Sequence, residues 1–288
     1  MKKIIGLLLA VTMMFALGGC NAITIDGEGE LSGENSGSGA VGFSVSTLNN
    51  PFFVSLSEGA KAEAEKQTND IEDLISRNVS VLIVNPVDSD AVAPAVQNAV
   101  SKGIKVISVD RVVNGVAVDC QIASDNAAGA KMATEYLIEL IGEGAKAAEL
   151  EGVPGASATI DRGAGFHEAA DKELDVVASQ TANFNRTEGM NVMENILQSC
   201  PEVKGVFAHN DEMALGAVEA VLASGKDIKI VGFDATDDAV AAVKSGKMAA
   251  TVAQKPELMG ETAVQTAMKL INGETVEKSL PVEVELIK

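Results

Sequence analysis

The chain has 288 residues, 47% of them hydrophobic, and carries a formal net charge of −19 at pH 7. A chain of this length and hydrophobic content buries one large core or two smaller ones, and we expect two lobes. The acidic charge argues against nucleic acid as a partner, because its phosphates would repel the protein.

Residues 1–20 have the features of a secretory signal. Lys2 and Lys3 precede an apolar run over residues 4–17, which is short for a membrane span, and the segment ends Leu-Gly-Gly-Cys at Cys20. This ending resembles a bacterial lipobox, in which the cysteine becomes the lipid-modified first residue of the mature protein. We therefore expect an extracytoplasmic lipoprotein on the outer face of a cell membrane. The alternative is an ordinary signal peptide with an incidental cysteine.

Residues 21–40 are rich in Gly, Ser and Glu and show no hydrophobic period, which indicates a flexible tether. Twenty such residues have a root-mean-square reach of roughly 25 Å. A tether of that reach holds a globular body just off a membrane surface.

Residues 41–53 predict a buried strand that leads into a binding loop. An apolar start gives way to turn formers at 46–50, and Pro51 suits the first turn of a following helix. The carboxyl end of such a strand is where ligands bind in an α/β sheet. Phe52 and Phe53 lie together there, although the chain has only eight Phe and one Tyr. The alternative is a structural role, in which they form a hydrophobic staple of the first helix.

From residue 41 onward, short β-branched runs alternate with helical stretches. This alternation predicts an α/β fold with parallel sheets and right-handed crossovers. The expected strands cover residues 80–84, 105–109, 146–150, 175–178, 203–208, 228–233 and 249–253, with an alternating edge strand at 282–287. The helices expected between them include residues 125–140, 186–197, 211–223 and 256–271.

Polar side chains follow several of these strands. They are Asp110 and Arg111, then His209, Asn210 and Asp211, then Asp234, and finally Gln254. One such residue is ordinary turn chemistry. Four such strand ends, with Asn50 and Arg162, offer carboxylate, amide and guanidinium groups without a nucleophile or a base relay.

This set of groups suits a small polyol. Each hydroxyl both donates and accepts, and a buried hydroxyl without a partner costs about 1–3 kcal/mol. Phe52, Phe53 and Phe184 offer aromatic walls for its C–H faces. For Asp110 and Arg111 the alternative is a structural ion pair.

No motif supports an enzyme. No G-x-G-x-x-G follows a strand, and no G-x-x-x-x-G-K-[ST] occurs, which argues against a dehydrogenase or an NTPase. His167 and His209 are the only histidines, and His167-Glu168 lacks the second histidine of H-E-x-x-H. We expect no catalytic residues, cofactor or metal. Cys120 and Cys200 lack metal-ligand spacing and are interpreted as buried free thiols, with a disulfide as the alternative.

The strand ends read, in chain order, S-T-L-N-N-P-F-F, S-V-D-R, I-A-S-D-N, D-R-G-A-G-F, A-N-F, H-N-D-E-M-A-L-G, V-G-F-D and A-Q-K-P. Over residues 41–288 these motifs resemble the ribose-binding proteins of bacterial ABC importers. The resemblance implies two Rossmann-like lobes joined by a three-stranded hinge near Ser124, Gln254 and Pro281. It implies an N-terminal lobe of residues 41–124 plus 255–281 and a C-terminal lobe of residues 125–254 plus 282–288.

The resemblance also implies that the protein captures a monosaccharide between the lobes and delivers it to the membrane permease of an ABC importer. The implied sugar contacts are Asn50, Phe52, Phe53, Asp110, Arg111, Arg162, Phe184, Asn210, Asp234 and Gln254. All ten match the residue types expected for ribose, so we favour D-ribose over hexoses. We expect a monomer, with a chemoreceptor as a possible second partner.

Alternative readings keep the two lobes but change the role. One is a binding protein for another sugar, or for a furanose-like signal in chemotaxis or quorum sensing. Repressors of the lactose-repressor family share the architecture, but they carry a basic helix-turn-helix where this chain has a signal sequence.

The chain departs from the family after its first helix, where a second strand is normally found. Lys66 runs directly into Gln67, with no Gly or Pro over residues 60–77. A single helix over residues 52–77 would span roughly 39 Å, whereas the return path needs about 20 Å. We therefore expect a break near residues 68–70. We also expect the strand that begins at Val41 to be an unprotected edge, in a first lobe less stable than that of a full-length relative.

Overall fold

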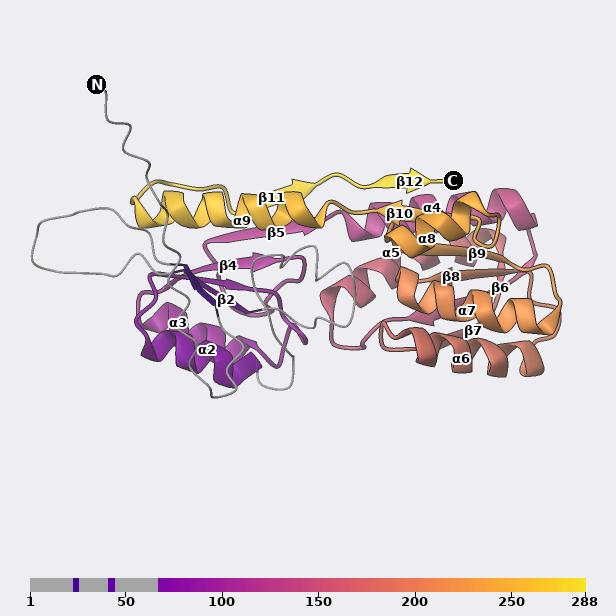
Figure 1. Cartoon of the computed structure of the whole chain (residues 1–288), viewed down its shortest axis with the longest axis horizontal. Coiled ribbons are helices and arrows are strands. Elements are labelled where there is room, and N and C mark those ends of the chain that lie inside the picture. The colour runs from indigo at the N-terminus through magenta and orange to yellow at the C-terminus, as the bar shows by residue number, and fades with distance from the viewer. Residues whose placement is uncertain (1–22, 26–40, 45–66) are drawn as a thin grey trace, which may run out of the picture.

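The computed structural model describes residues 23–25, 41–44 and 67–288. In this part of the chain the strands form two six-stranded sheets, each flanked by helices, which confirms the predicted α/β fold with two lobes (Figure 1). The first sheet has the order β1-β2-β3-β4-β5-β11 and the second has the order β12-β10-β9-β8-β6-β7.

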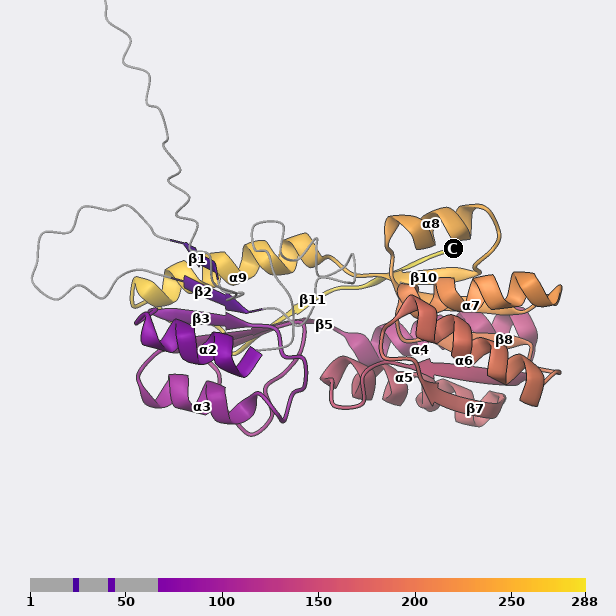
Figure 2. The same cartoon turned by 60° about the horizontal axis from the view of Figure 1, so that its bottom comes forward.

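The first lobe contains the first sheet and three described helices. Its strands are β1 (Ile23–Ile25), β2 (Val41–Ser44), β3 (Val81–Val84), β4 (Lys105–Val109), β5 (Cys120–Ser124) and β11 (Ser279–Val282). Its helices are α2 (Gln67–Ser76), α3 (Ala93–Ser101) and α9 (Pro256–Ile271). All four residues of β3 are buried, as is typical of a parallel strand covered on both faces. Residues of α2 and α3 pack on one face of the sheet, and residues of α9 pack on the other (Figures 1 and 2).

The second lobe contains the second sheet and five helices. Its strands are β6 (Lys146–Glu151), β7 (Asp175–Thr181), β8 (Gly205–Ala208), β9 (Lys229–Asp234), β10 (Ala250–Ala253) and β12 (Glu285–Ile287). Its helices are α4 (Asn126–Ile141), α5 (Ser157–Glu173), α6 (Arg186–Ser199), α7 (Asp211–Ser224) and α8 (Asp237–Lys244). One core lies between the sheet and α6 and α7, and a second core lies between the sheet and α4 and α5. The sheet is therefore covered on both faces.

Within residues 67–288 the chain passes between the two sheets three times (Figure 2). It does so between β5 and α4, between β10 and α9, and between β11 and β12. These passages follow Ser124, Ala253 and Val282, close to the expected hinge positions near Ser124, Gln254 and Pro281. The predicted strand over residues 282–287 is too long, because β11 ends at Val282 and the edge strand β12 begins at Glu285.

Strand β1 lies antiparallel to β2 and pairs Ile23 with Phe43, Thr24 with Gly42 and Ile25 with Val41. Two expectations are therefore wrong: residues 23–25 are not tether, and β2 is not an unprotected edge. The physical reason is that the open edge of β2 presents unpaired N–H and C=O groups, and a nearby extended segment can form backbone hydrogen bonds with them. The Ile-Thr-Ile segment has high β propensity and fills the edge position.

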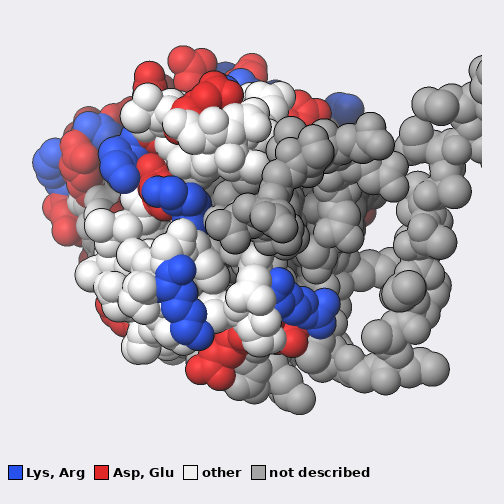
Figure 3. Space-filling model, turned by 90° about the vertical axis from the view of Figure 1, so that its left-hand side faces the viewer, with Lys and Arg blue, Asp and Glu red and all other residues white. Residues whose placement is uncertain are grey.

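Helix α2 includes residues 68–70 without interruption, so the predicted break does not occur there. Several other predictions, including the first helix, Cys20, Asn50, Phe52 and Phe53, lie outside the described residues. Cys120 and Cys200 are free thiols, as expected, but only Cys120 is buried and Cys200 is partly exposed. Among the described helices, none has the length and apolar character required to cross a bilayer. On the first-lobe face in Figure 3, acidic and basic side chains are interspersed with uncharged ones.

Candidate functional site

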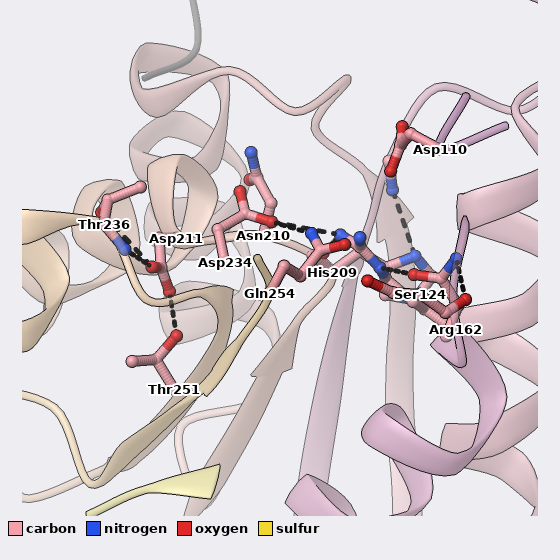
Figure 4. A network of polar contacts seen from close by, with 12 residues as sticks. Asp110, Ser124, Arg162, His209, Asn210, Asp211, Asp234, Thr236, Thr251 and Gln254 are labelled. Atoms are coloured by element: carbon pink, nitrogen blue, oxygen red, sulfur yellow. Dashed lines mark hydrogen bonds and ion pairs between the residues drawn. The ribbon is translucent and has the colours of Figure 1, made fainter. Parts of the chain in front are cut away.

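Six of the predicted contact residues have buried side chains, and five of them lie at or just after the carboxyl ends of strands. Asp110 and Arg111 follow β4 in the first lobe. Asn210 follows β8, Asp234 ends β9, Gln254 follows β10 and Arg162 lies on α5, all in the second lobe. Their exposed fractions are 7% or less, although charged residues are rarely buried without partners. Figure 4 shows that side chains from both lobes form one polar network.

Arg162 is held on several sides. Its Nε donates a hydrogen bond of 2.9 Å to Oδ1 of Asn126, and its Nη1 donates to the backbone carbonyl of His209. The guanidinium carbon lies 3.8 Å from the centroid of the Phe233 ring, and Nη1 lies 3.7 Å from Oδ1 of Asp234. The guanidinium is therefore fixed in orientation by the protein itself.

Asp110 and Arg111 form an ion pair and are also held separately. Oδ2 of Asp110 accepts a hydrogen bond of 3.1 Å from Nδ2 of Asn85 and lies 3.6 Å from Nε of Arg111. Nη1 of Arg111 donates to the carbonyls of Pro86 and Val87. The structural ion pair between Asp110 and Arg111, which is the alternative to a role in sugar binding, is therefore present. It involves only Oδ2 of Asp110.

Three buried polar atoms at this site have no hydrogen-bond partner among the described residues. They are Oδ1 of Asp110, Nδ2 of Asn210 and Oε1 of Gln254. In Asn210 and Gln254 the other polar atom of the amide already has a hydrogen-bond partner. Oδ1 of Asn210 accepts from the Met213 N–H at the start of α7, and Nε2 of Gln254 donates to Asp234. A buried polar group without a partner costs about 1–3 kcal/mol, so these atoms favour a polar ligand. Together they offer two acceptors and one donor, which suits hydroxyl groups.

Burial sets the electrostatics of the site. Burial raises the pKa of Asp110, and the charges of Arg111 and Arg162 and the hydrogen bond from Asn85 offset part of that rise. Burial also lowers the pKa of Arg111 and of Arg162, while nearby carboxylates oppose the change. Both guanidinium groups remain protonated. Arg162 influences Asp110 although the two residues belong to different lobes, so the site is electrostatically continuous across the lobes.

Phe184 of the second lobe places its aromatic ring next to Arg111 of the first lobe. The guanidinium carbon of Arg111 lies 5.3 Å from its ring centroid. The residue has a φ of 56°, which is uncommon for a bulky side chain. The ring lies against Gly152, where a Cβ atom would be 2.0 Å from Cζ of Phe184, so only glycine fits beneath it.

The two histidines differ in exposure. His209 is fully buried at the end of β8, where Nδ1 accepts from the Gly152 N–H and Nε2 therefore donates to Oε1 of Glu149. Burial lowers the pKa of His209, which favours this neutral form. The side chain of His167 on α5 is 41% exposed.

Sequence reasoning missed residues that support the site instead of pointing into it. Asn85 follows β3 just as Asp110 follows β4, so the same strand-end rule identifies it. Asn126 begins α4, where a polar residue is ordinary capping chemistry and gives no separate signal.

Comparison with known proteins places this chain in a family. The model of the periplasmic binding protein domain matches residues 41–275. The ribose import binding protein of Bacillus subtilis is 45% identical, and the match covers 99% of this chain and 99% of the relative. The ribose import binding protein of Escherichia coli is 47% identical over 84% of this chain and 88% of the relative. The D-apiose import binding protein of Actinobacillus succinogenes is 37% identical over 81% and 82%.

Solved structures agree. An ABC transporter solute-binding protein of Bacillus halodurans with bound myo-inositol has a TM-score of 0.82 at 33% identity, covering 86% of this chain and 93% of that one. One from Actinobacillus succinogenes with bound D-allose has a TM-score of 0.79 at 31% identity, covering 86% and 96%. The chain therefore belongs to the periplasmic binding protein family, whose members are extracytoplasmic solute-binding proteins of transporters and not enzymes.

Proposed function

We propose that this protein captures D-ribose between its two lobes and delivers it to the permease of an ABC importer. The observation that carries the proposal is the set of buried, unpartnered atoms on Asp110, Asn210 and Gln254. The import relatives at 45% and 47% identity, which are named for ribose, support the choice of sugar.

The sugar contacts divide between the lobes. Asp110 and Arg111 act from the first lobe, and Arg162, Asn210, Asp234 and Gln254 act from the second. Phe184 packs against the ring, and Asn50, Phe52 and Phe53 complete the site. Ionised side chains form stronger hydrogen bonds than neutral ones, so the four charged residues supply most of the affinity.

A ligand that bridges the lobes stabilises the closed state relative to an open one. Closure is then the signal to the permease. The moving bodies are residues 41–124 plus 255–281 and residues 125–254 plus 282–288, and the chain acts as a monomer. A chemoreceptor is a second candidate partner for the closed state.

Cys20 carries lipid in this proposal and anchors the protein to the outer face of the cell membrane. The Leu-Gly-Gly-Cys ending after an apolar run supports it. A Cys20→Ala variant is expected to be released or left unprocessed on cell fractionation. A variant that is still processed and anchored would show that the attachment is of another kind.

The alternative is another sugar, or a furanose-like signal in chemotaxis or quorum sensing. Related structures that hold D-allose and myo-inositol support the alternative of another sugar. A thermal-shift panel of D-ribose, D-allose, D-apiose and myo-inositol separates these cases. A ligand at one hundred times its Kd adds about 2.7 kcal/mol of stability, so ribose is expected to give the largest rise in Tm. A clear rise with a hexose and none with ribose would refute the choice of sugar.

A further inference from the structure

Helix α5, which carries Arg162, lacks an N-cap of its own. The N-cap residue is Ala156, whose methyl side chain cannot accept a hydrogen bond from the helix. The first N–H groups of a helix have no partner within it, and alanine is a poor cap. Ala156, Ser157 and Ala158 are all buried, so water has little access to these groups.

The missing cap comes from the other lobe. Ser89, which lies between β3 and α3 in the first lobe, accepts a hydrogen bond of 3.2 Å through Oγ from the Ser157 N–H. The Ser89 N–H in turn donates to the carbonyl of Gly155 across 3.0 Å. In the reverse direction, Oγ of Ser157 accepts from the N–H of Val112, which follows β4. Three hydrogen bonds therefore join the start of α5 to the first lobe.

Gly155 allows this close approach. A Cβ atom at this position would lie 1.7 Å from Oδ2 and 2.5 Å from Cγ of Asp88. The Asp88 carboxylate cannot easily move aside, because Oδ1 accepts hydrogen bonds of 2.8 Å from the N–H groups of Asp90 and Ala91. Gly155 is not among the glycines with a positive φ, so its backbone does not itself require glycine. The lack of a side chain matters only for contact with the other lobe.

We propose that Asp88, Ser89, Gly155 and Ser157 form an interlobe clasp that caps α5 only when the lobes are closed, and thereby raises the affinity for sugar. The carboxylate of Asp88 also suits the positive end of the α5 dipole. Opening the lobes breaks all three hydrogen bonds and returns the start of α5 to water. None of the four residues is a proposed sugar contact, so they act on binding through the closed state. The inference rests on the proposed function, because it requires a ligand that closes the lobes.

The first test is Ser89→Ala. The variant loses one acceptor and leaves the Ser157 N–H without it in the closed state, so the Kd for D-ribose is expected to rise about three- to tenfold. The change should appear mainly in the dissociation rate. Ser101→Ala is the matched control, because Ser101 is an exposed serine at the end of α3 in the same lobe, and it should bind as the unmodified chain does.

The second test is Gly155→Ala with rescue. The added methyl should weaken binding by at least about tenfold, because it meets Asp88 only when the lobes close. Adding Asp88→Ala removes the obstructing carboxylate, so the double variant should recover part of the loss. Such a recovery is a coupling between the lobes, which a purely local defect in α5 would not produce.

Calorimetry and stopped-flow kinetics with D-ribose, and small-angle scattering with and without it, supply the readouts. Normal affinity in both Ser89→Ala and Gly155→Ala would overturn the clasp, as would a double variant no better than Gly155→Ala alone. If the unmodified chain does not bind ribose but binds another sugar of the panel, the choice of ribose is wrong. The clasp is then tested with that sugar, so the two failures remain distinct.

Discussion

Gln254 donates a hydrogen bond from Nε2 to Oδ1 of Asp234 across 2.7 Å, which joins the ends of the neighbouring strands β10 and β9. The bond fixes the orientation of the Gln254 amide, and Oε1 is then the atom left without a partner among the described residues. Asp234 also lies 3.7 Å from Arg162. The carboxylate therefore orients both a neutral and a charged neighbour at the site.

Replacing Asp234 with alanine should abolish sugar-induced compaction while the fold remains intact. The change removes a proposed sugar contact and leaves the buried Arg162 without its carboxylate, so affinity should fall at least about a hundredfold. Small-angle scattering with and without D-ribose measures compaction, and circular dichroism checks the fold. Asp237→Ala, an exposed position at the start of α8, is the control. Unchanged compaction in the Asp234 variant would contradict its assignment.

Thr251→Val should weaken the support beneath Asp234. The Thr251 hydroxyl donates to Oδ1 of Asp211 across 2.6 Å and accepts from the Ala235 N–H across 3.2 Å. These bonds hold a turn in which φ is 126° at Asp234 and 55° at Ala235, a conformation that non-glycine residues seldom adopt.

Valine keeps the shape of Thr251 but leaves the buried Asp211 carboxylate and the partly buried Ala235 N–H without this partner. The free energy of unfolding in urea should fall by about 1–3 kcal/mol, and ribose should bind more weakly. Thr262→Val in α9 is the matched control, because that threonine is only half-buried and lies in the other lobe. Equal effects of the two changes would show that the hydroxyl of Thr251 does not support the turn.

The affinity for sugar should fall in acid because of Asp110. Burial raises the pKa of its carboxyl above the ordinary 3.8, and hydrogen bonds from sugar hydroxyls stabilise the ionised form. The free protein therefore binds more protons than the complex, so the Kd should rise as pH falls through that raised pKa and stay level well above it. Calorimetry from about pH 4 to pH 8 measures the trend.

Asp110→Asn is the control for this pH dependence. It removes the titrating group but leaves His209 and Asp211 in place, so its weaker binding should lose the dependence assigned to Asp110. If the acid limb persists unchanged in Asp110→Asn, another group causes it.

Thr24→Pro should expose the edge of β2. Proline removes the N–H of the central residue of β1 and opposes a regular strand, so the amides of β2 should exchange hydrogen faster. Thr24→Ala is the control and should leave exchange nearly unchanged. We also expect lower protection in the first lobe than in the second, because β1 has only three residues. Uniform protection across both lobes would show that the first lobe has repacked without loss of stability.

Strands and their polar ends were predictable because both leave a local signal. Residues 81–84 read Val-Leu-Ile-Val, and a polar residue directly after such a run marks the end of a strand. The sequence also indicated the ends of α4 and α9 within two residues. These features depend on neighbouring residues alone.

The features that escaped prediction depend on distant parts of the chain. Strand β1 is three residues within a Gly- and Glu-rich stretch, and only the vacant edge of β2 makes it a strand. The start of α5 left no capping signal, because Ala156 is a poor cap and the acceptor is Ser89 of the other lobe. The gap between β11 and β12 was not predicted because residues 282–287 alternate without a visible interruption.

We expect the lobes to bind D-ribose without converting it. Calorimetric titration of the purified mature protein with D-ribose is the sharpest test of this expectation. We expect saturable heat, recovery of unchanged ribose from the complex, and an affinity below that of the Bacillus subtilis relative measured in parallel. No heat with ribose, with clear heat from a hexose such as D-allose, would contradict the claim.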